Sequence, residues 1–121
     1  GQQGIEKIIL PIKGYGLWST LYGFLALESD LETVAGIGFY EHNETPGLGG
    51  EVDNPRWKAS WVGKQAYSSG QMAISVLKGR ADMTLPEGNY QIDGLAGATL
   101  TTRGVNNLVQ YWLGEQGFSH S

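Results

Sequence analysis

Apolar residues in the first part of the chain are grouped into three segments that predict β-strands. Residues 5–12 are β-branched and apolar, and they end at the glycine-containing segment 13–16, which indicates a strand followed by a turn. Residues 20–28 and 33–40 mix apolar with aromatic side chains, and Asp30 lies in the short polar connection between them. We therefore expect three strands, the last two joined as a hairpin.

Helical features begin after a loop rich in glycine and proline. Asn54 can cap a short helix that has Pro55 at its first position. Trp57, Trp61 and Val62 then fall on one face of that helix. The pattern predicts a short helix with an apolar, tryptophan-rich face.

The last helix has the strongest pattern. Its apolar stripe repeats at i, i+3, i+4, i+7 and i+8 and consists of Val105, Leu108, Val109, Trp112 and Leu113. Thr101 or Thr102 is the expected N-cap, because a threonine hydroxyl can accept a hydrogen bond from a free amide of the first turn. Gly114 and Gly117 are expected to end the helix.

Residues 71–77 alternate between apolar and polar side chains and add one further predicted strand. Strands combined with a few helices predict the α+β class, here a mainly antiparallel sheet packed with helices. The 121 residues, 40% of them apolar, provide material for one core. We therefore expect residues 1–121 to form a single domain.

Composition excludes several classes of function. The net charge of -4, from 12 acidic and 8 basic residues, does not suit binding to nucleic acid. No apolar run approaches the roughly 20 residues of a transmembrane helix, and residues 1–14 lack the layout of a signal peptide. The chain has no cysteine and two histidines, too few of either to predict a metal site. We expect a soluble chain that binds no metal.

Glycine is frequent and gathered in two loops, one of which leads directly into the last helix. That loop reads DGLAGATLT from Asp93 to Thr101 and brings small residues and hydroxyls to a helix N-terminus. Free amides and the helix dipole favour an anion such as phosphate at this position. The local pattern alone favours an ordinary capping turn over a phosphate site, because threonines are common at helix caps. The loop matches neither the Walker A sequence nor the dinucleotide-binding glycine pattern.

This loop resembles the D-G-x-(S/T)-G-A-T motif of FMN-binding domains. Three other segments, 16–23, 38–49 and 54–59, carry the sequences GLWSTLYG, GFYEHNETPGLG and NPRWKA. Together the four segments are similar to the C-terminal periplasmic domain of the C-type subunit of the sodium-translocating NADH:quinone oxidoreductase. The similarity extends over most of the chain.

The resemblance implies FMN joined by a phosphoester to Thr99, which is the last residue of the GAT triplet. A flavin transferase would form this bond from FAD, and Asp93 is the residue that we expect the transferase to need. Ala96 departs from the motif, which often has serine or threonine there, but it is not the attachment residue. No residue of the domain is expected to act as a catalytic acid, base or nucleophile.

The resemblance also implies a binding site for the rest of the cofactor. Its expected residues are Leu17, Trp18, Ser19, Glu44, Thr45, Gly47, Leu48, Lys78, Asp93, Gly97, Ala98, Leu100 and Thr101. Leu48 and Trp18 offer surfaces to the flavin ring, although Trp18 suits a hydrophobic core equally well. Lys78 and Arg103 could meet the phosphate but are typical of exposed surface charges. A structural, hydrogen-bonded role is expected for His42.

The resulting hypothesis is a one-electron carrier in a sodium-translocating NADH:quinone reductase. Its partners would be the other subunits, notably another flavin-bearing subunit, and the flavin transferase. Full-length family members have an N-terminal transmembrane helix, so we expect this chain to be an excised part on the periplasmic side of the bacterial inner membrane. The G-type flavinylated subunit of an Rnf-type ferredoxin oxidoreductase and a non-flavinylated ligand-binding or structural module are the alternatives.

Overall fold

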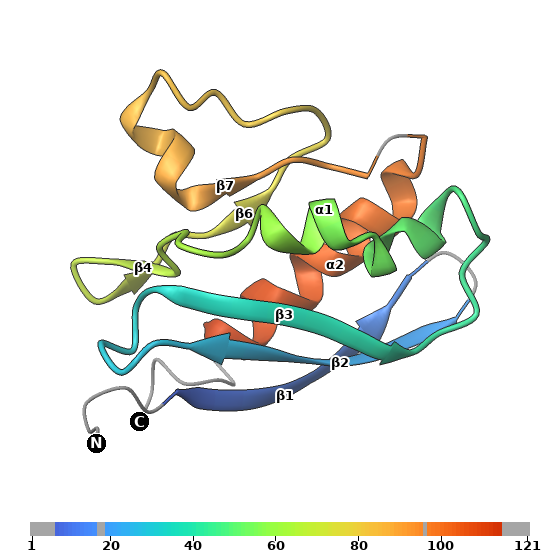
Figure 1. The fold of residues 1–121 in the computed structure, drawn as a ribbon, viewed down its shortest axis with the longest axis horizontal. Coiled ribbons are helices and arrows are strands. Elements are labelled where there is room, and N and C mark those ends of the chain that lie inside the picture. The colour runs from blue at the N-terminus through green and yellow to red at the C-terminus, as the bar shows by residue number, and fades with distance from the viewer. Residues whose placement is uncertain (1–6, 17–18, 96, 115–121) are drawn as a thin grey trace.

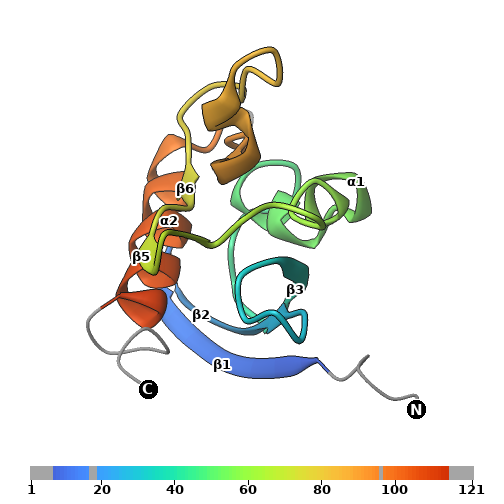
Figure 2. The same cartoon turned by 90° about the vertical axis from the view of Figure 1, so that its left-hand side faces the viewer.

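The computed structural model describes residues 7–16, 19–95 and 97–114. Its main sheet has three antiparallel strands in the order β1 (Ile8–Tyr15), β2 (Thr20–Leu27) and β3 (Val34–Glu41). The helix α2 (Thr99–Leu113) packs against β1 on the face of this sheet that also carries the rest of the chain (Figures 1 and 2). The predicted α+β class and the mainly antiparallel sheet are confirmed.

The remaining elements are short and lie on the same side of the sheet as α2 (Figure 1). They are the 3-10 turn η1 (Gly49–Asp53), the helix α1 (Pro55–Ala59), the strands β4 (Tyr67–Ser68), β5 (Gln71–Met72) and β6 (Ser75–Val76), the 3-10 turn η2 (Pro86–Tyr90) and the strand β7 (Gln91–Ile92). Strands β4 and β5 pair in antiparallel fashion, whereas β6 and β7 form a parallel pair. No helix within the described ranges is long and apolar enough to span a bilayer.

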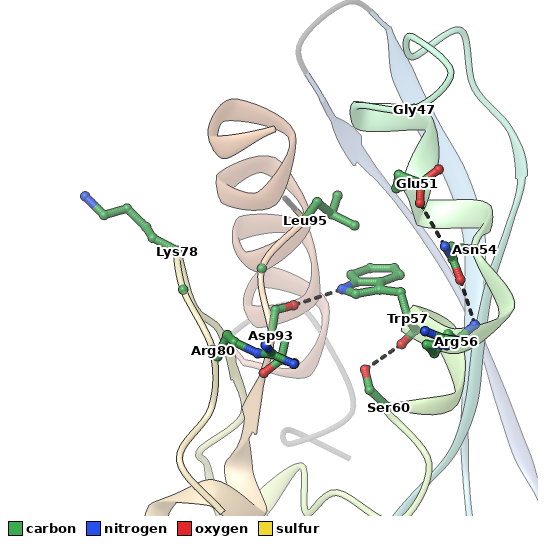
Figure 3. Close-up of a pocket in the computed structure, with 12 residues that line it drawn as sticks. Gly47, Glu51, Asn54, Arg56, Trp57, Ser60, Lys78, Arg80, Asp93 and Leu95 are labelled. Carbon is green, nitrogen blue, oxygen red and sulfur yellow. Dashed lines mark hydrogen bonds and ion pairs between the residues drawn. The ribbon is translucent and has the colours of Figure 1, made fainter. Parts of the chain in front are cut away.

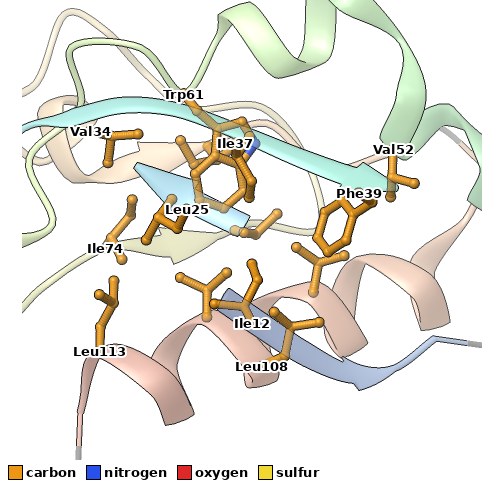
Figure 4. Packing of buried hydrophobic residues seen from close by; sticks show 14 of the residues in the cluster. Ile12, Leu25, Val34, Ile37, Phe39, Val52, Trp61, Ile74, Leu108 and Leu113 are labelled. Atoms are coloured by element: carbon orange, nitrogen blue, oxygen red, sulfur yellow. The ribbon is translucent and has the colours of Figure 1, made fainter. Parts of the chain in front are cut away.

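The hydrophobic core lies between the main sheet and the two helices. On β2, alternate residues point to one face because side chains change face at every position of a strand. Leu21, Leu25 and Leu27 are fully buried there, and the stripe of α2 packs toward them (Figure 4). Trp61 closes the core from the other side and meets Trp57 edge to face, with ring centroids 5.6 Å apart. The predicted core face of α2 is therefore correct.

Two glycines allow α2 to approach β1 closely. A Cβ atom at Gly104 would overlap the carbonyl oxygen of Tyr15, and one at Gly14 would overlap the side chain of Leu108. The indole Nε1 of Trp112 donates a hydrogen bond to the carbonyl oxygen of Lys13 at 3.0 Å. The backbone contact fixes the height of the helix over the strand and thereby the position of its N-terminus.

Local polar contacts confirm two of the predicted boundaries. In the β2–β3 connection, Asp30 Oδ1 accepts hydrogen bonds from the amides of Glu32 and Thr33, each at 2.8 Å. A hydrogen bond from the Thr33 hydroxyl, together with these two amide bonds, holds the pKa of Asp30 below its usual value. At α1, the side chain of Asn54 accepts from the Arg56 amide at 2.8 Å, as expected of an N-cap.

Three expectations about the elements were wrong. Strand β1 continues through Gly14 to Tyr15, because pairing with Leu21 and Thr20 overrides the turn composition. The predicted strand 71–77 is divided into β5 and β6, which pair with different partners. Val62 is 56% exposed, because α1 ends at Ala59, before the helical spacing reaches it.

The close approach of α2 to β1 gives a first prediction. Gly104→Ala would normally stabilise a helix by about 1 kcal/mol. Here the added methyl group must displace the Tyr15 carbonyl, so we expect a loss of about 2 kcal/mol in the free energy of unfolding, measured by urea denaturation. Asn107→Ala, at an exposed position of the same helix, is the control and should be neutral or slightly stabilising. Wild-type stability of the Gly104→Ala variant would show that the contact is not close.

Tyr67 gives a second prediction, on pH. Its hydroxyl donates to the Leu113 carbonyl at 2.9 Å, and burial raises the pKa of Tyr67 above its ordinary value. The folded state therefore binds the phenolic proton more tightly than the unfolded chain, so this stabilisation is complete below about pH 10 and is lost as the pH rises further.

Tyr67→Phe should lack the loss of folding stability that ionisation of Tyr67 causes at alkaline pH. At neutral pH it should lower the free energy of unfolding by about 1 kcal/mol, because the hydrogen bond to Leu113 is missing. Urea unfolding curves at about pH 8 and about pH 11 measure both effects. Tyr40→Phe, whose ring is 71% exposed, should keep the wild-type pH dependence. An alkaline loss of equal size in both variants would disprove the role of Tyr67.

Candidate functional site

A small cavity of about 260 Å³ lies where α2 begins. It is lined by Glu44, Thr45, Leu48, Gly49, Gly97, Ala98, Thr99, Leu100 and Thr101. One wall is the loop that follows β3, and the other is residues 97–101, which end the DGLAGATLT segment and form the first turn of α2. The structure thus brings together two sequence motifs that are far apart along the chain.

The N-terminus of α2 has no side-chain cap. Its N-cap residue is Ala98, and no side chain bonds to the amides of the first turn in this capping position. Thr99 is the first residue of the helix and is exposed. The first amides of a helix have no partner within the helix and carry the positive end of its dipole. They therefore offer hydrogen-bond donors to an anion held near Thr99.

The expected N-cap at Thr101 or Thr102 was wrong, because both side chains turn into the protein. Thr102 Oγ1 accepts a hydrogen bond from the Leu95 amide at 2.9 Å. Thr101 Oγ1 donates to Glu44 Oε1 at 2.7 Å. Both threonines are almost completely buried, 1% and 2% exposed. Partners outside the helix therefore occupy the hydroxyls that the local pattern assigned to capping.

Glu44 connects three segments of the chain through its carboxylate. The side chain is only 5% exposed. Oε2 accepts from both the amide and the hydroxyl of Ser19, each at 3.0 Å, and Oε1 accepts from Thr101. The Ser19 hydroxyl in turn accepts from the Asn43 amide at 2.8 Å. Sequence reasoning placed Glu44 in the site but did not anticipate that it joins the 16–19 loop to α2.

Glycine makes the room for this carboxylate and shapes the cavity wall. A Cβ atom would lie 2.7 Å from Glu44 Oε1 if added at Gly16 and 2.8 Å from the same oxygen at Gly49. Gly97 has a φ of +71°, in the left-handed region that favours glycine. A Cβ there would lie 3.3 Å from Leu48 Cδ2, so the Leu48 side chain covers the backbone of Gly97.

His42 is bonded through both ring nitrogens. Nδ1 accepts from the Glu44 amide at 3.1 Å, and Nε2 lies 2.8 Å from Asp53 Oδ2. An imidazole nitrogen that accepts from an amide carries no proton, so Nε2 carries the hydrogen and donates it to Asp53. The structural, hydrogen-bonded role predicted for His42 is confirmed, and it supports the loop that contains Glu44.

A larger cavity of about 680 Å³ lies between α1 and the segments 78–80 and 93–95 (Figure 3). It is lined by Gly47, Glu51, Asn54, Arg56, Trp57, Ser60, Lys78, Gly79, Arg80, Asp93, Gly94 and Leu95. Trp57 Nε1 donates to the carbonyl oxygen of Asp93 at 2.9 Å, so the tryptophan forms the floor between these elements. Trp57 thus belongs to both the core and the cavity wall.

Asp93 and Lys78 lie in this larger cavity, outside the set of residues that line the small one. Asp93 Oδ1 accepts from the Ala81 amide at 2.7 Å, and Oδ2 lies 3.9 Å from Arg80 Nε. The Lys78 side chain extends away from Trp57 and Asp93 (Figure 3). Arg103 is exposed on α2. Leu17, Trp18 and Ala96 lie outside the described residues.

The small cavity fits a phosphate group better than a catalytic centre. Gly97 and Ala98 bring no polar side chain, the first amides of α2 are uncapped, and Thr99 is exposed beside them. The residues that line it include one titratable side chain, Glu44, whose two oxygens already accept hydrogen bonds. The arrangement can hold an esterified phosphate without a proton donor or a metal.

Sequence comparison identifies relatives over nearly the whole chain. The C-type subunit of the Na(+)-translocating NADH-quinone reductase of Pseudomonas aeruginosa is 62% identical over 115 residues, which are 94% of this chain and 44% of that protein. The corresponding subunit of Yersinia pestis is 53% identical over 115 residues, with 94% and 42% covered. The chain therefore spans less than half of the length of these relatives. The similarity to this subunit inferred from the motifs is confirmed.

Solved structures agree with this similarity. The crystal structure of NqrC from Shewanella oneidensis matches with a TM-score of 0.83 and 39% identity, covering 93% of this chain and 51% of that chain. The C-type subunit of the Na(+)-translocating NADH-quinone reductase of Parabacteroides distasonis matches with a TM-score of 0.80 and 33% identity, covering 98% and 59%. The model of the FMN-binding domain family matches residues 16–114, which include both walls of the small cavity. The chain therefore belongs to the family of FMN-binding domains.

Proposed function

We propose that this domain carries FMN attached through a phosphoester to Thr99 and serves as an electron carrier of a sodium-translocating NADH:quinone reductase. One observation carries the proposal: an exposed threonine hydroxyl begins a helix whose first amides are uncapped, inside a cavity walled by glycine. Membership of the FMN-binding domain family supports the identity of the cofactor.

The attachment follows from the chemistry of the first turn of α2. A phosphoester on Thr99 brings its negative charge next to the backbone amides at the start of α2. The amides of Thr99, Leu100 and Thr101 can donate hydrogen bonds to it, and the positive end of the helix dipole stabilises the negative charge. Gly97 and Ala98 have no polar side chain that would compete for these donors. Flavin supplies reversible electron transfer when bound, while the protein orients it and adjusts its potential.

The rest of the cofactor needs more space than the small cavity offers. Binding sites of drug-sized ligands measure about 300 to 1,000 Å³, so a cavity of about 260 Å³ suits the phosphate and the adjoining chain of the cofactor. We assign ring contacts to Thr45, Leu48 and Gly47 in the loop after β3, and to Leu17 and Trp18. Ser19 acts through its hydrogen bonds to Glu44, and Glu44 in turn accepts a hydrogen bond from Thr101.

Asp93 and Lys78 take part from the larger cavity. Asp93 holds the 78–81 segment through the Ala81 amide, so its expected importance for the flavin transferase includes the shape of the loop that presents Thr99. Lys78 adds positive charge at the rim of the larger cavity, where it can approach an anionic ligand. Neither residue is needed as an acid or base in this proposal.

The relatives support the proposed assembly. Their name assigns them to a reductase with several subunits, and 62% identity favours the C-type subunit over the G-type flavinylated subunit of an Rnf-type complex. We place the domain on the periplasmic side of the bacterial membrane, where it exchanges electrons with another flavin-bearing subunit. The chain 1–121 then acts as one FMN-binding domain of a longer subunit. A flavin transferase acts on it during maturation.

A third prediction tests the attachment. Thr99→Ala, expressed in a host that has the flavin transferase, should lose the covalent adduct of about 438 Da that the wild-type chain carries. The measurements are intact mass and ultraviolet fluorescence of the band in a denaturing gel. Thr99 is exposed at the start of α2, so the variant should keep the wild-type melting temperature.

Thr84→Ala is the matched control, because it removes the same atoms from an exposed turn that lines neither cavity. It should keep the adduct. A fluorescent band for Thr99→Ala would show that the flavin is attached to another residue. Wild-type protein that binds FMN but releases it on denaturation would support the non-covalent alternative.

A further inference from the structure

Glu44 places a buried negative charge in the wall of the cavity that contains Thr99. We propose that this carboxylate is a positioning and tuning residue: it holds the start of α2 against Ser19 and lowers the reduction potential of the flavin carried by Thr99. The inference rests on the proposed function and goes beyond it, because it assigns the control of the potential to one residue.

The hydrogen bonds indicate that the carboxylate is ionised. The Ser19 amide can only donate, and it bonds to Oε2 at 3.0 Å. The Ser19 hydroxyl accepts from the Asn43 amide, which leaves its own hydrogen for Oε2. On the other side, Thr101 donates to Oε1 at 2.7 Å. Hydrogen bonds donated to a carboxyl group favour its charged form, and Ser19 donates two of them to Oε2.

Burial makes this charge effective. A side chain that is 5% exposed has little contact with water and salt, so its field reaches neighbouring groups with less screening. Thr101 and Thr99 both line the cavity, two residues apart in the first turn of α2. The charge therefore acts on whatever Thr99 carries.

Glycine keeps the carboxylate in one place. A Cβ atom at Gly16 or Gly49 would come within 2.7 or 2.8 Å of Oε1, so a larger residue at either position would displace the carboxylate from its present place. A Cβ at Gly49 would also lie 2.6 Å from Thr101 Oγ1. The two loops thus form a site that is shaped for a carboxylate bonded to Thr101.

The sign of the effect follows from electrostatics. Reduction adds negative charge to the flavin, and a nearby buried negative charge opposes this change. Glu44 therefore lowers the midpoint potential. Removing the charge while keeping the shape should raise it.

The test uses the flavinylated domain and measures the midpoint potential by spectroelectrochemical titration, with the melting temperature as a second readout. Glu44→Gln is expected to shift the potential in the positive direction and to lower the melting temperature. Glu87→Gln is the control, because Glu87 is exposed in η2 and lines neither cavity; it should keep the wild-type potential. A merely structural role of Glu44 would change the melting temperature alone.

A second variant covers the case in which Glu44→Gln does not fold. Thr101→Val removes a donor but keeps the charge, so the less compensated carboxylate should shift the potential in the negative direction. A wild-type potential in flavinylated Glu44→Gln, or in Thr101→Val if the first variant does not accumulate, overturns the inference alone. Wild-type protein without any flavin adduct overturns the proposed function and this inference together.

Discussion

The backbone contact between α2 and β1 is the constraint on which the site depends. Gly104 lies against the Tyr15 carbonyl, and Gly14 lies under Leu108. With the helix held at this height, its first turn reaches the loop that follows β3, where Thr101 meets Glu44. Larger residues at the two glycines would lift the helix and separate the walls of the small cavity.

In the first turn of α2, the threonine side chains and the backbone amides serve different purposes. Threonine hydroxyls commonly cap helices, yet Thr101 and Thr102 bond to Glu44 and Leu95 inside the protein. Ala98 occupies the capping position and has no oxygen to offer. The buried side chains give the helix start its stability, while its amides stay available for an external anion.

Sequence reasoning succeeded where a feature depends on neighbouring residues. The stripe on α2, the Asn54 cap and the Asp30 turn each arise within a few positions, so their spacing predicts them. It failed where the partner is distant along the chain. The inward turn of Thr101 depends on Glu44, 57 positions away, which no local pattern contains. The path of β1 through Gly14 depends on pairing with β2, which outweighs the turn composition of residues 13–16.

The same limit applies to the candidate site. Thr99, Ala98, Gly97 and Leu48 lie together as the resemblance implies. Gly47, Lys78 and Asp93 were expected beside them but line the neighbouring cavity. A sequence motif shows which residues lie close together along the chain, whereas the three-dimensional structure shows which of them line the same cavity.

The DGLAGATLT segment therefore combines two tasks. Its beginning is structural: Asp93 accepts from the Ala81 amide, and the Gly94 amide donates to the Gly79 carbonyl at 2.8 Å. A Cβ at Gly94 would overlap the carbonyl of Leu77, so this glycine is needed for the two segments to lie together. Its end provides the cavity wall and the exposed hydroxyl. Because the first half holds the backbone from which the second half extends, a change at Asp93 would alter the presentation of Thr99, the proposed attachment residue, without a direct contact between the two side chains.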